Sequence, residues 1–251
     1  MDIVEIFGTK ICNVTMEEAL EKIGAFLGGE DLRVIFTPNT EIVMAAREDS
    51  NLRDIINQGD LVVPDGIGLI YASKIKKRPL KERVTGYDIS MNLLKTANEN
   101  SHSLYLLGGK EGIAKAAGDK IGEIYPNIRL LGYHHGYFKG SHNGYRGHEE
   151  EEKIVSEINS LRPDIIFLGL GFPKQELWIN INKSRIKAKL IIGNGGVMDV
   201  LSGEAKRAPE IFIRLGLEWL YRLIKEPWRL RRQMALPSFM IRVIFSRDVV
   251  K

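Results

Sequence analysis

The sequence predicts an α/β protein with a mostly parallel, Rossmann-like sheet that is flanked by helices. Short apolar runs without polar interruptions, such as residues 32–38 and 164–173, are typical of strands buried on both faces. These runs alternate with segments whose apolar residues recur at helical spacing, and this alternation favours parallel βαβ units. The chain has 251 residues, 44% of them hydrophobic, which is enough for one sizeable core.

The elements follow one another through the first 200 residues or so. Residues 4–14 predict a short hairpin, and residues 15–27 predict a helix that begins at Thr15 with Glu18 in capping-box position. Further strands are expected at 32–38, 60–64, 103–109, 128–138, 164–173 and 188–196. Further helices are expected at 39–50, 66–75, 110–126 and 149–163. The last of these has its acidic residues in the first turn, where the helix dipole favours them.

In open sheets of this kind, ligands bind outside the carboxyl ends of the strands. Five segments are therefore expected at one rim: residues 37–40, 64–66, 108–112, 169–176 and 193–199. Asp65 has two interpretations at this stage. An aspartate before a helix is commonly its N-cap, and local sequence favours that interpretation. A carboxylate at a ligand-binding rim is also well placed to act as a general base.

Gly108 and Gly109 begin the sequence GGKEG, which follows a strand and opens a helix, so backbone N–H groups there are candidates for binding a phosphate. A tight strand–helix turn is the simpler interpretation of this motif alone. A dinucleotide site is disfavoured, because the motif is not G-x-G-x-x-G and no acidic residue follows at the required distance. The five histidines lack the spacing of metal ligands, so we predict neither a metal nor a cofactor.

The character of the chain changes after Gly203, and we expect a catalytic core at 1–203 and a basic amphipathic appendage at 204–251. Residues 206–247 contain ten Lys/Arg and three acidic residues, a net charge of +7 against +4 for the whole chain. Pro209 lies near the start of a predicted helix and Pro227 near its end, with apolar residues spaced by four between them. Such a segment is typical of a helix lying on an anionic membrane surface, and its apolar face also predicts self-association without a membrane. Aromatic stacking platforms for nucleic acid are not evident.

The cellular compartment of the protein is predicted from three features that the sequence lacks: a cysteine pair, a signal peptide and a membrane-spanning run. The single cysteine, Cys12, cannot form an internal disulfide, the N-terminus does not resemble a signal peptide, and no apolar run is long enough to span a bilayer. We therefore expect a cytoplasmic protein that attaches peripherally to the inner face of the membrane.

Several long motifs occur together in a fixed order: TPNTEIV, VVPDGIGLI, ERVTGYDI, YLLGG, HHGYF, PDIIFLGLGFPKQE and KRAP…RLGLEWLYRLIKEPWRLRR. In content and order the chain resembles the WecG/TagA/CpsF glycosyltransferases over almost its whole length. The resemblance implies a metal-independent, inverting transfer of N-acetylmannosamine from UDP-ManNAc to the 4-hydroxyl of GlcNAc in undecaprenyl-diphosphate-GlcNAc, which gives a β(1→4) link in wall teichoic acid assembly. Alternatives are a family member that uses UDP-glucose or UDP-N-acetylmannosaminuronic acid, and a non-catalytic membrane adaptor.

The resemblance also implies roles for individual residues. Asp65 matches the proposed general base of the family. The other matching positions are Thr37, Asn39, Arg83 and Gln175 in the substrate pocket, Arg222, Arg229 and Arg232 over the diphosphate, and Gly108, Gly109, Tyr137 and Asp199 around the nucleotide. The chain departs from the family pattern at a longer loop near 139–147 and at Asn194, where a small apolar residue is expected.

Overall fold

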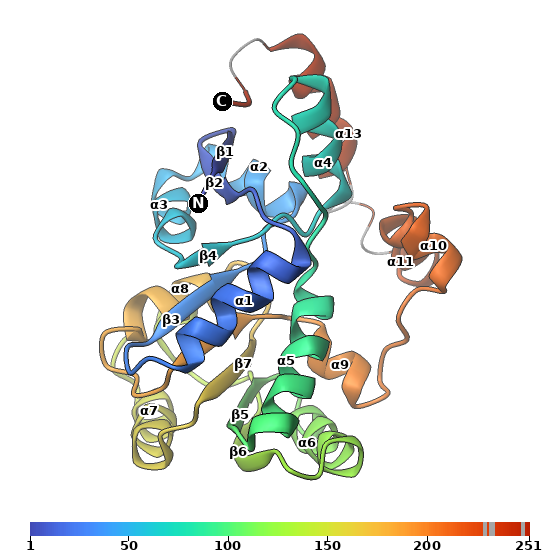
Figure 1. Ribbon diagram of the computed structural model, residues 1–251. Helices are drawn as coiled ribbons and strands as arrows, with labels where there is room; N and C mark the ends of the chain where they lie inside the picture. The colour runs from blue at the N-terminus through green and yellow to red at the C-terminus, as the bar shows by residue number, and fades with distance from the viewer. Residues whose placement is uncertain (228–229, 231–233, 247–248) are drawn as a thin grey trace.

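The computed structural model describes residues 1–227, 230, 234–246 and 249–251 (Figure 1). Its centre is a six-stranded sheet in the order β4-β3-β8-β7-β5-β6, and every pair of neighbouring strands is parallel. The strands are β3 (Arg33–Phe36), β4 (Leu61–Val62), β5 (Ser103–Gly108), β6 (Arg129–His134), β7 (Ile165–Gly169) and β8 (Leu190–Gly193). The predicted α/β class and parallel sheet are thus confirmed.

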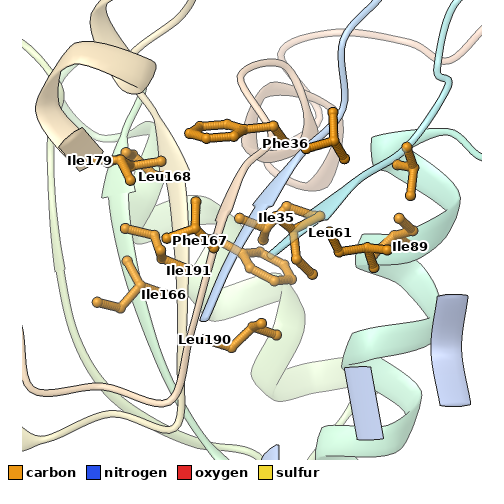
Figure 2. Packing of buried hydrophobic residues seen from close by; sticks show 14 of the residues in the cluster. Ile35, Phe36, Leu61, Ile89, Ile166, Phe167, Leu168, Ile179, Leu190 and Ile191 are labelled. Atoms are coloured by element: carbon orange, nitrogen blue, oxygen red, sulfur yellow. The ribbon is translucent and has the colours of Figure 1, made fainter. Parts of the chain in front are cut away.

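The middle of the sheet is buried on both faces, as its uninterrupted apolar runs predict. Figure 2 shows side chains of β3, β7 and β8 packed together, among them Ile35, Phe167 and Ile191, each at most 1% exposed. Ile35 pairs with Ile192, which pairs in turn with Phe167, so the three strands are in register across the core. The hydrophobic effect of this burial holds the strand ends, and everything attached to them, in fixed positions.

Helices cover the sheet. They are α1 (Met16–Leu27), α2 (Thr40–Glu48), α3 (Ser50–Asn57), α4 (Ile67–Ile75), α5 (Gly86–Asn100), α6 (Ile113–Ile124), α7 (Glu149–Leu161), α8 (Lys174–Asn182) and α9 (Val197–Leu201). Helices α1 and α5 contact each other and lie in front of the strands in Figure 1, while α3 contacts α8. Four of these helices, α3, α5, α8 and α9, were not predicted from the sequence.

Two predicted local features are confirmed at the N-terminus. Strands β1 (Ile3–Ile6) and β2 (Thr9–Cys12) form an antiparallel hairpin. Its two turn residues, Phe7 and Gly8, both have positive φ (50° and 84°), as in the tight turns that match the twist of a hairpin. Helix α1 begins at Thr15, whose hydroxyl accepts from the Glu18 N–H at 3.2 Å while the Glu18 carboxylate accepts from the Thr15 N–H at 2.9 Å.

The single helix predicted between Pro209 and Pro227 is wrong, because the segment forms two short helices, α10 (Glu210–Arg214) and α11 (Glu218–Lys225). Gly216 lies between them with φ +70°, a left-handed conformation that ends α10 and that glycine adopts without strain. A side chain at this position would also meet Ile67 at 2.9 Å. Figure 1 shows α10 and α11 standing out from the sheet and its covering helices.

The end of the chain returns to the core. Helix α13 (Ala235–Phe245) lies along α4 and also contacts α2, and it buries Phe239 and Val243 completely (Figure 1). Beyond it, the backbone of Lys251 exchanges two hydrogen bonds of 2.9 Å with Glu5 of β1. Part of the segment after residue 203 is therefore packed with the core. No helix among the described residues combines the length and apolarity that crossing a bilayer requires.

Candidate active site

A cleft of about 690 Å³ opens at the carboxyl ends of the parallel strands. Each of the six strands contributes to its wall within a few residues of its last position. These residues are Thr37 after β3, Asp65 after β4, Gly109 after β5, Tyr137 after β6, Leu170 after β7 and Asn194 after β8. The rim predicted from the strand ends is the wall of one cleft.

Asp65 does not cap the helix that follows it. Gly66 occupies the N-cap position of α4, and no side chain caps this helix. Asp65 Oδ2 instead accepts from the backbone N–H of Gly86, the first residue of α5, at 3.3 Å. The capping interpretation is therefore wrong for α4, because the sheet brings Asp65 to the N-terminus of a different helix, whose dipole favours a negative charge.

The guanidinium of Arg83 holds Asp65 from the other side. Arg83 Nε donates to the backbone carbonyl of Asp65 at 2.6 Å, and Arg83 Nη2 lies 3.6 Å from Asp65 Oδ1. The second distance is that of an ion pair and exceeds a hydrogen bond. Burial raises the pKa of the Asp65 carboxyl above its ordinary value, the charge of Arg83 opposes this rise, and the charge of Glu218 adds to it. A carboxylate with a raised pKa is a stronger base.

Glu218 is a residue of the cleft that the sequence analysis missed. It is the first residue of α11 and its side chain is 11% exposed. Glu218 Oε2 accepts from Arg83 Nη2 at 3.1 Å, and Oε1 accepts from Arg222 Nη2 at 2.7 Å. Burial opposes its ionisation, but Arg222 and Arg83 outweigh burial and lower the pKa of Glu218. The spacing of Glu218 and Arg222 by four residues was the one signal in the sequence.

Thr37 and Asn39 lie beside Asp65 in the cleft wall. Asn39 caps α2, since its Oδ1 accepts from the Ile42 N–H at 3.1 Å. Thr37 packs against Gly86 so closely that a Cβ on Gly86 would lie 2.8 Å from the Thr37 hydroxyl. The start of α5 therefore needs glycine for this close approach.

Gln175 and Asn194 form the wall on the β7–β8 side, and both are at least nine-tenths buried. Ser90 Oγ donates its only proton to the Gly86 carbonyl at 2.7 Å, so it must accept from Asn194 Nδ2, at 3.0 Å. This arrangement turns Asn194 Oδ1 away from Ser90. Within the described part of the chain neither Asn194 Oδ1 nor Gln175 Oε1 has a hydrogen-bond partner. Gln175 Nε2 donates to Glu176 at 3.0 Å.

The predicted nucleotide residues are not all in the same environment. Gly109, Tyr137 and Asp199 line the cleft, and Tyr137 is 73% exposed at its edge. Gly108 does not line it. A Cβ on Gly108 would lie 2.4 Å from the carbonyl oxygen of Gly169, so this glycine allows β5 and β7 to approach closely where both strands end.

The longer loop near 139–147 also reaches the cleft, through Lys139 and Asn143. Its short 3-10 turn, η1 (Ser141–Asn143), is tied to α7 because the Ser141 hydroxyl donates to the buried carboxylate of Glu151 at 2.6 Å.

Positive charge lines the cleft on several sides. Arg83 and Arg222 are at one end, while Arg229 and Arg232 lie outside the residues that the structure describes. Three lysines that the sequence analysis did not single out also line it: Lys110, Lys139 and Lys174. Lys110 lies within GGKEG and Lys174 within PKQE, so their place beside strand ends was the available signal. No group of three or more His, Cys, Asp or Glu side chains among the described residues is arranged to hold a metal ion.

Sequence comparison identifies relatives of this chain. Residues 4–249 match the sequence profile of a family described as "Glycosyl transferase WecG/TagA/CpsF family". The chain belongs to this family. It is therefore a glycosyltransferase, and its cleft lies at the carboxyl ends of the strands, where ligands bind in open α/β sheets.

Two curated relatives have the name N-acetylglucosaminyldiphosphoundecaprenol N-acetyl-beta-D-mannosaminyltransferase. The protein of Staphylococcus aureus (strain MRSA252) is 35% identical over 99% of this chain and 94% of its own length. The protein of Bacillus subtilis (strain 168) is 36% identical over 89% of this chain and 80% of its own length. The first of these alignments covers almost the whole chain, the cleft included.

Proposed function

We propose that this glycosyltransferase transfers N-acetylmannosamine from UDP-ManNAc to the 4-hydroxyl of GlcNAc in undecaprenyl-diphosphate-GlcNAc, with inversion, in wall teichoic acid assembly. The names of the two relatives support the choice of sugar and acceptor. One observation carries the chemistry. Asp65 lines the cleft, and no hydrogen bond to its Oδ1 is formed among the described residues, while its Oδ2 accepts from the Gly86 N–H. An inverting transfer needs one such carboxylate to take a proton.

In the proposed step, the oxygen of the GlcNAc 4-hydroxyl attacks the anomeric carbon of N-acetylmannosamine in line with the bond to UDP. The O–H bond breaks and its proton moves to Asp65 Oδ1, while the new C–O bond forms. The bond from the anomeric carbon to the β-phosphate oxygen breaks, and its electron pair leaves with UDP. Atoms and charge balance, because Asp65 becomes neutral as UDP gains one negative charge.

Departure of UDP requires positive charge at its phosphates. We infer that Lys110, Lys139 and Lys174 stabilise that charge from the donor side of the cleft, which they line. Arg83 and Arg222, with Arg229 and Arg232, are proposed to bind the diphosphate of the acceptor. Thr37, Asn39 and Gln175 are proposed to bind the sugars, and Gly109, Tyr137 and Asp199 the nucleotide. Gly108 supports this last group through the packing of β5.

The proposed function is tested by measuring UDP release from a panel of UDP-ManNAc, UDP-glucose and UDP-N-acetylmannosaminuronic acid, with a soluble analogue of the lipid-diphosphate-GlcNAc acceptor. UDP-ManNAc should be the preferred donor. Asp65→Asn should reduce kcat by about 100-fold or more, as expected for the loss of a general base. The control is Asp119→Asn, the same change at a residue 60% exposed on α6, which should leave kcat unchanged. Preference for another donor, or near-normal turnover by Asp65→Asn, would contradict this assignment.

We further propose that the enzyme attaches peripherally to the inner face of the membrane through α10 and α11. These helices expose Ile211, Leu215 and Ile224 to between 60% and 64%, next to the basic side chains of Arg214 and Lys225. Apolar side chains flanked by cations are suited to an interface with anionic lipid. In this proposal the membrane-binding part of the predicted appendage is the pair α10–α11, while α13 stays with the catalytic core. The same apolar surface is where self-association would occur without a membrane.

Replacing Ile211, Leu215 and Ile224 together by serine should abolish sedimentation with vesicles that contain an anionic phospholipid. Ile124→Ser, at a residue 50% exposed at the end of α6, should leave sedimentation unchanged. These point substitutions are preferable to removal of all residues after 203, because truncation would also remove the buried side chains of α13. Undiminished sedimentation of the triple variant would refute attachment through these helices.

A further inference from the structure

Glu218 stands out among the buried charges of the cleft, because its two carboxylate oxygens hold arginines from two separate parts of the chain. Arg83 comes from the loop between α4 and α5, and Arg222 lies one turn further along α11. Glu218 lies 135 residues from Arg83 in the sequence. The carboxylate is thus the physical connection between α11 and the loop that carries Arg83.

The position of Arg83 explains why this connection matters. Its Nε donates to the Asp65 carbonyl at 2.6 Å. Its Nη2 lies near two carboxylates, those of Glu218 and Asp65. Nη2 lies 3.1 Å from Glu218 Oε2, a hydrogen bond, and 3.6 Å from Asp65 Oδ1, which is too long for one. Glu218 therefore takes the hydrogen bond that Asp65 would otherwise receive.

We propose that Glu218 is a positioning residue, which draws the guanidinium of Arg83 away from Asp65 and fixes Arg222 at the cleft, so that Asp65 Oδ1 stays free to accept the proton of the acceptor. This inference rests on the proposed role of Asp65 as general base. Glu218 itself does not need to contact the reacting atoms.

The charges around Asp65 support this role. Among the described residues, the titratable groups that line the same cleft are Glu41 of α2, Arg83 of the loop before α5, Tyr87 of α5, Asp199 of α9, Glu218 and Arg222 of α11, and Tyr137, Lys110, Lys139 and Lys174 beyond the ends of β5, β6 and β7, and the Gly86 N–H also faces Asp65. Among the causes acting on Asp65, burial and the charge of Glu218 raise its pKa, while Arg83, the Gly86 N–H and Arg222 lower it. Loss of the Glu218 charge removes one of the causes that raise the pKa and frees Arg83 to close on Oδ1. Both changes lower the pKa of Asp65 and make it a weaker base.

The test compares Glu218→Gln with Glu210→Gln, which removes the same charge from an exposed i,i+4 pair with Arg214 on α10. The pKa of Asp65 is measured without substrate, by NMR titration of the full chain with 13C-labelled aspartate, and its signal is assigned by its loss in Asp65→Asn. We expect Glu218→Gln to lower the pKa of Asp65 and Glu210→Gln to leave it unchanged. Equal pKa values in the wild type and Glu218→Gln would overturn the inference. This measurement needs no turnover, so its failure is distinct from a failure of the proposed function.

Kinetics provide the second measurement. In Glu218→Gln the acid limb of the kcat profile should move to lower pH, and kcat at its plateau should fall about 10-fold or more, since a misplacement of the order of 1 Å has effects of that size. Glu218→Asp keeps the charge but its shorter side chain cannot hold both arginines. Its acid limb should move less than that of Glu218→Gln, because the charge is kept, but it should still lose kcat, and it remains available if Glu218→Gln does not fold. Wild-type kcat in Glu218→Asp would overturn the positioning role.

Discussion

The packing of α13 predicts that the same substitution, phenylalanine to alanine, has a large effect on stability on the buried face of this helix and almost none on its exposed face. Phe239 is fully buried between α13, α4 and the hairpin, and its ring meets the ring of Phe7 edge-on at 5.4 Å between centroids. Phe245 lies at the end of the same helix and is 82% exposed. We expect Phe239→Ala to destabilise the protein strongly and Phe245→Ala to leave its stability almost unchanged.

The magnitude follows from burial. Truncating a fully buried phenylalanine costs about 3–5 kcal/mol, since transfer free energy is lost and a cavity remains. The edge-on contact with Phe7 contributes about 0.5–1.5 kcal/mol beyond its buried area, so the upper half of that range is expected. An exposed phenylalanine loses neither buried area nor a ring contact when it is truncated, so the stability of Phe245→Ala should stay within about 0.5 kcal/mol of that of the wild type. Stabilities of natural proteins are about 5–15 kcal/mol, so the first loss is a large fraction of the total.

Urea unfolding followed by circular dichroism measures both variants. With slopes of about 2–3 kcal/mol per molar urea, a loss of about 4 kcal/mol moves the midpoint by about 1.3–2 M, while the midpoint of the control should not move measurably. An equal midpoint for the two variants, or a loss below about 1 kcal/mol for Phe239→Ala, would refute the conclusion that α13 belongs to the core.

Two further predictions concern Glu176, the neighbour of Gln175, and Gly86 in the wall of the cleft. Burial raises the pKa of Glu176 to about 7, from an ordinary value of 4.5, so the native state binds a proton that the unfolded state releases, and stability falls as pH rises through that interval. Glu176→Gln should remove this fall, because glutamine has no proton to release. The free energy of unfolding of the variant should exceed that of the wild type by up to about 3 kcal/mol near pH 8 and differ little from it near pH 4. A gain in stability that does not grow with pH would contradict the assignment. Gly86→Ala should displace Thr37 and reduce kcat/KM about 10-fold or more, because the new Cβ would lie 2.8 Å from the Thr37 hydroxyl. Gly122→Ala, in the open space on α6, should leave kcat/KM unchanged and gain up to about 1 kcal/mol in unfolding measurements, and equal activity of the two variants would argue against the packing described for Thr37.

The place of the cleft was predictable from the sequence because it depends on local patterns. Apolar runs mark buried strands, and the carboxyl ends of parallel strands lie at one edge, so Thr37, Asp65 and Gln175 were expected near one another before any contact was known. The family resemblance supplied proposed roles for these residues, and the structure adds the contacts through which each is held.

The contacts across long sequence distances were not predictable. Local sequence alone favoured Asp65 as the cap of its own helix, and only the tertiary structure brings it to the N-terminus of α5. Glu218 was missed because its importance comes from Arg83, which no spacing in the sequence connects to it. Only one apolar face of α13, with Phe239 and Val243, packs on the core beside α2 and α4, while Ile241, Ile244 and Phe245 are exposed. An apolar helix face has the same pattern whether it packs on a membrane or on its own core, so the sequence could not separate α13 from α10 and α11.

The return of the chain end to the hairpin has a consequence for how α10 and α11 can move. With α9 on one side and α13 on the other, this pair of helices is part of a bridge attached to the core at both ends, and not a free tail. A bridge fixed at two points samples fewer positions than a free tail of equal length, so less conformational entropy is lost when it settles at the cleft. Because the second attachment consists of α13 and residues 249–251, which pair with β1, both attachments exist only after these residues have been synthesised.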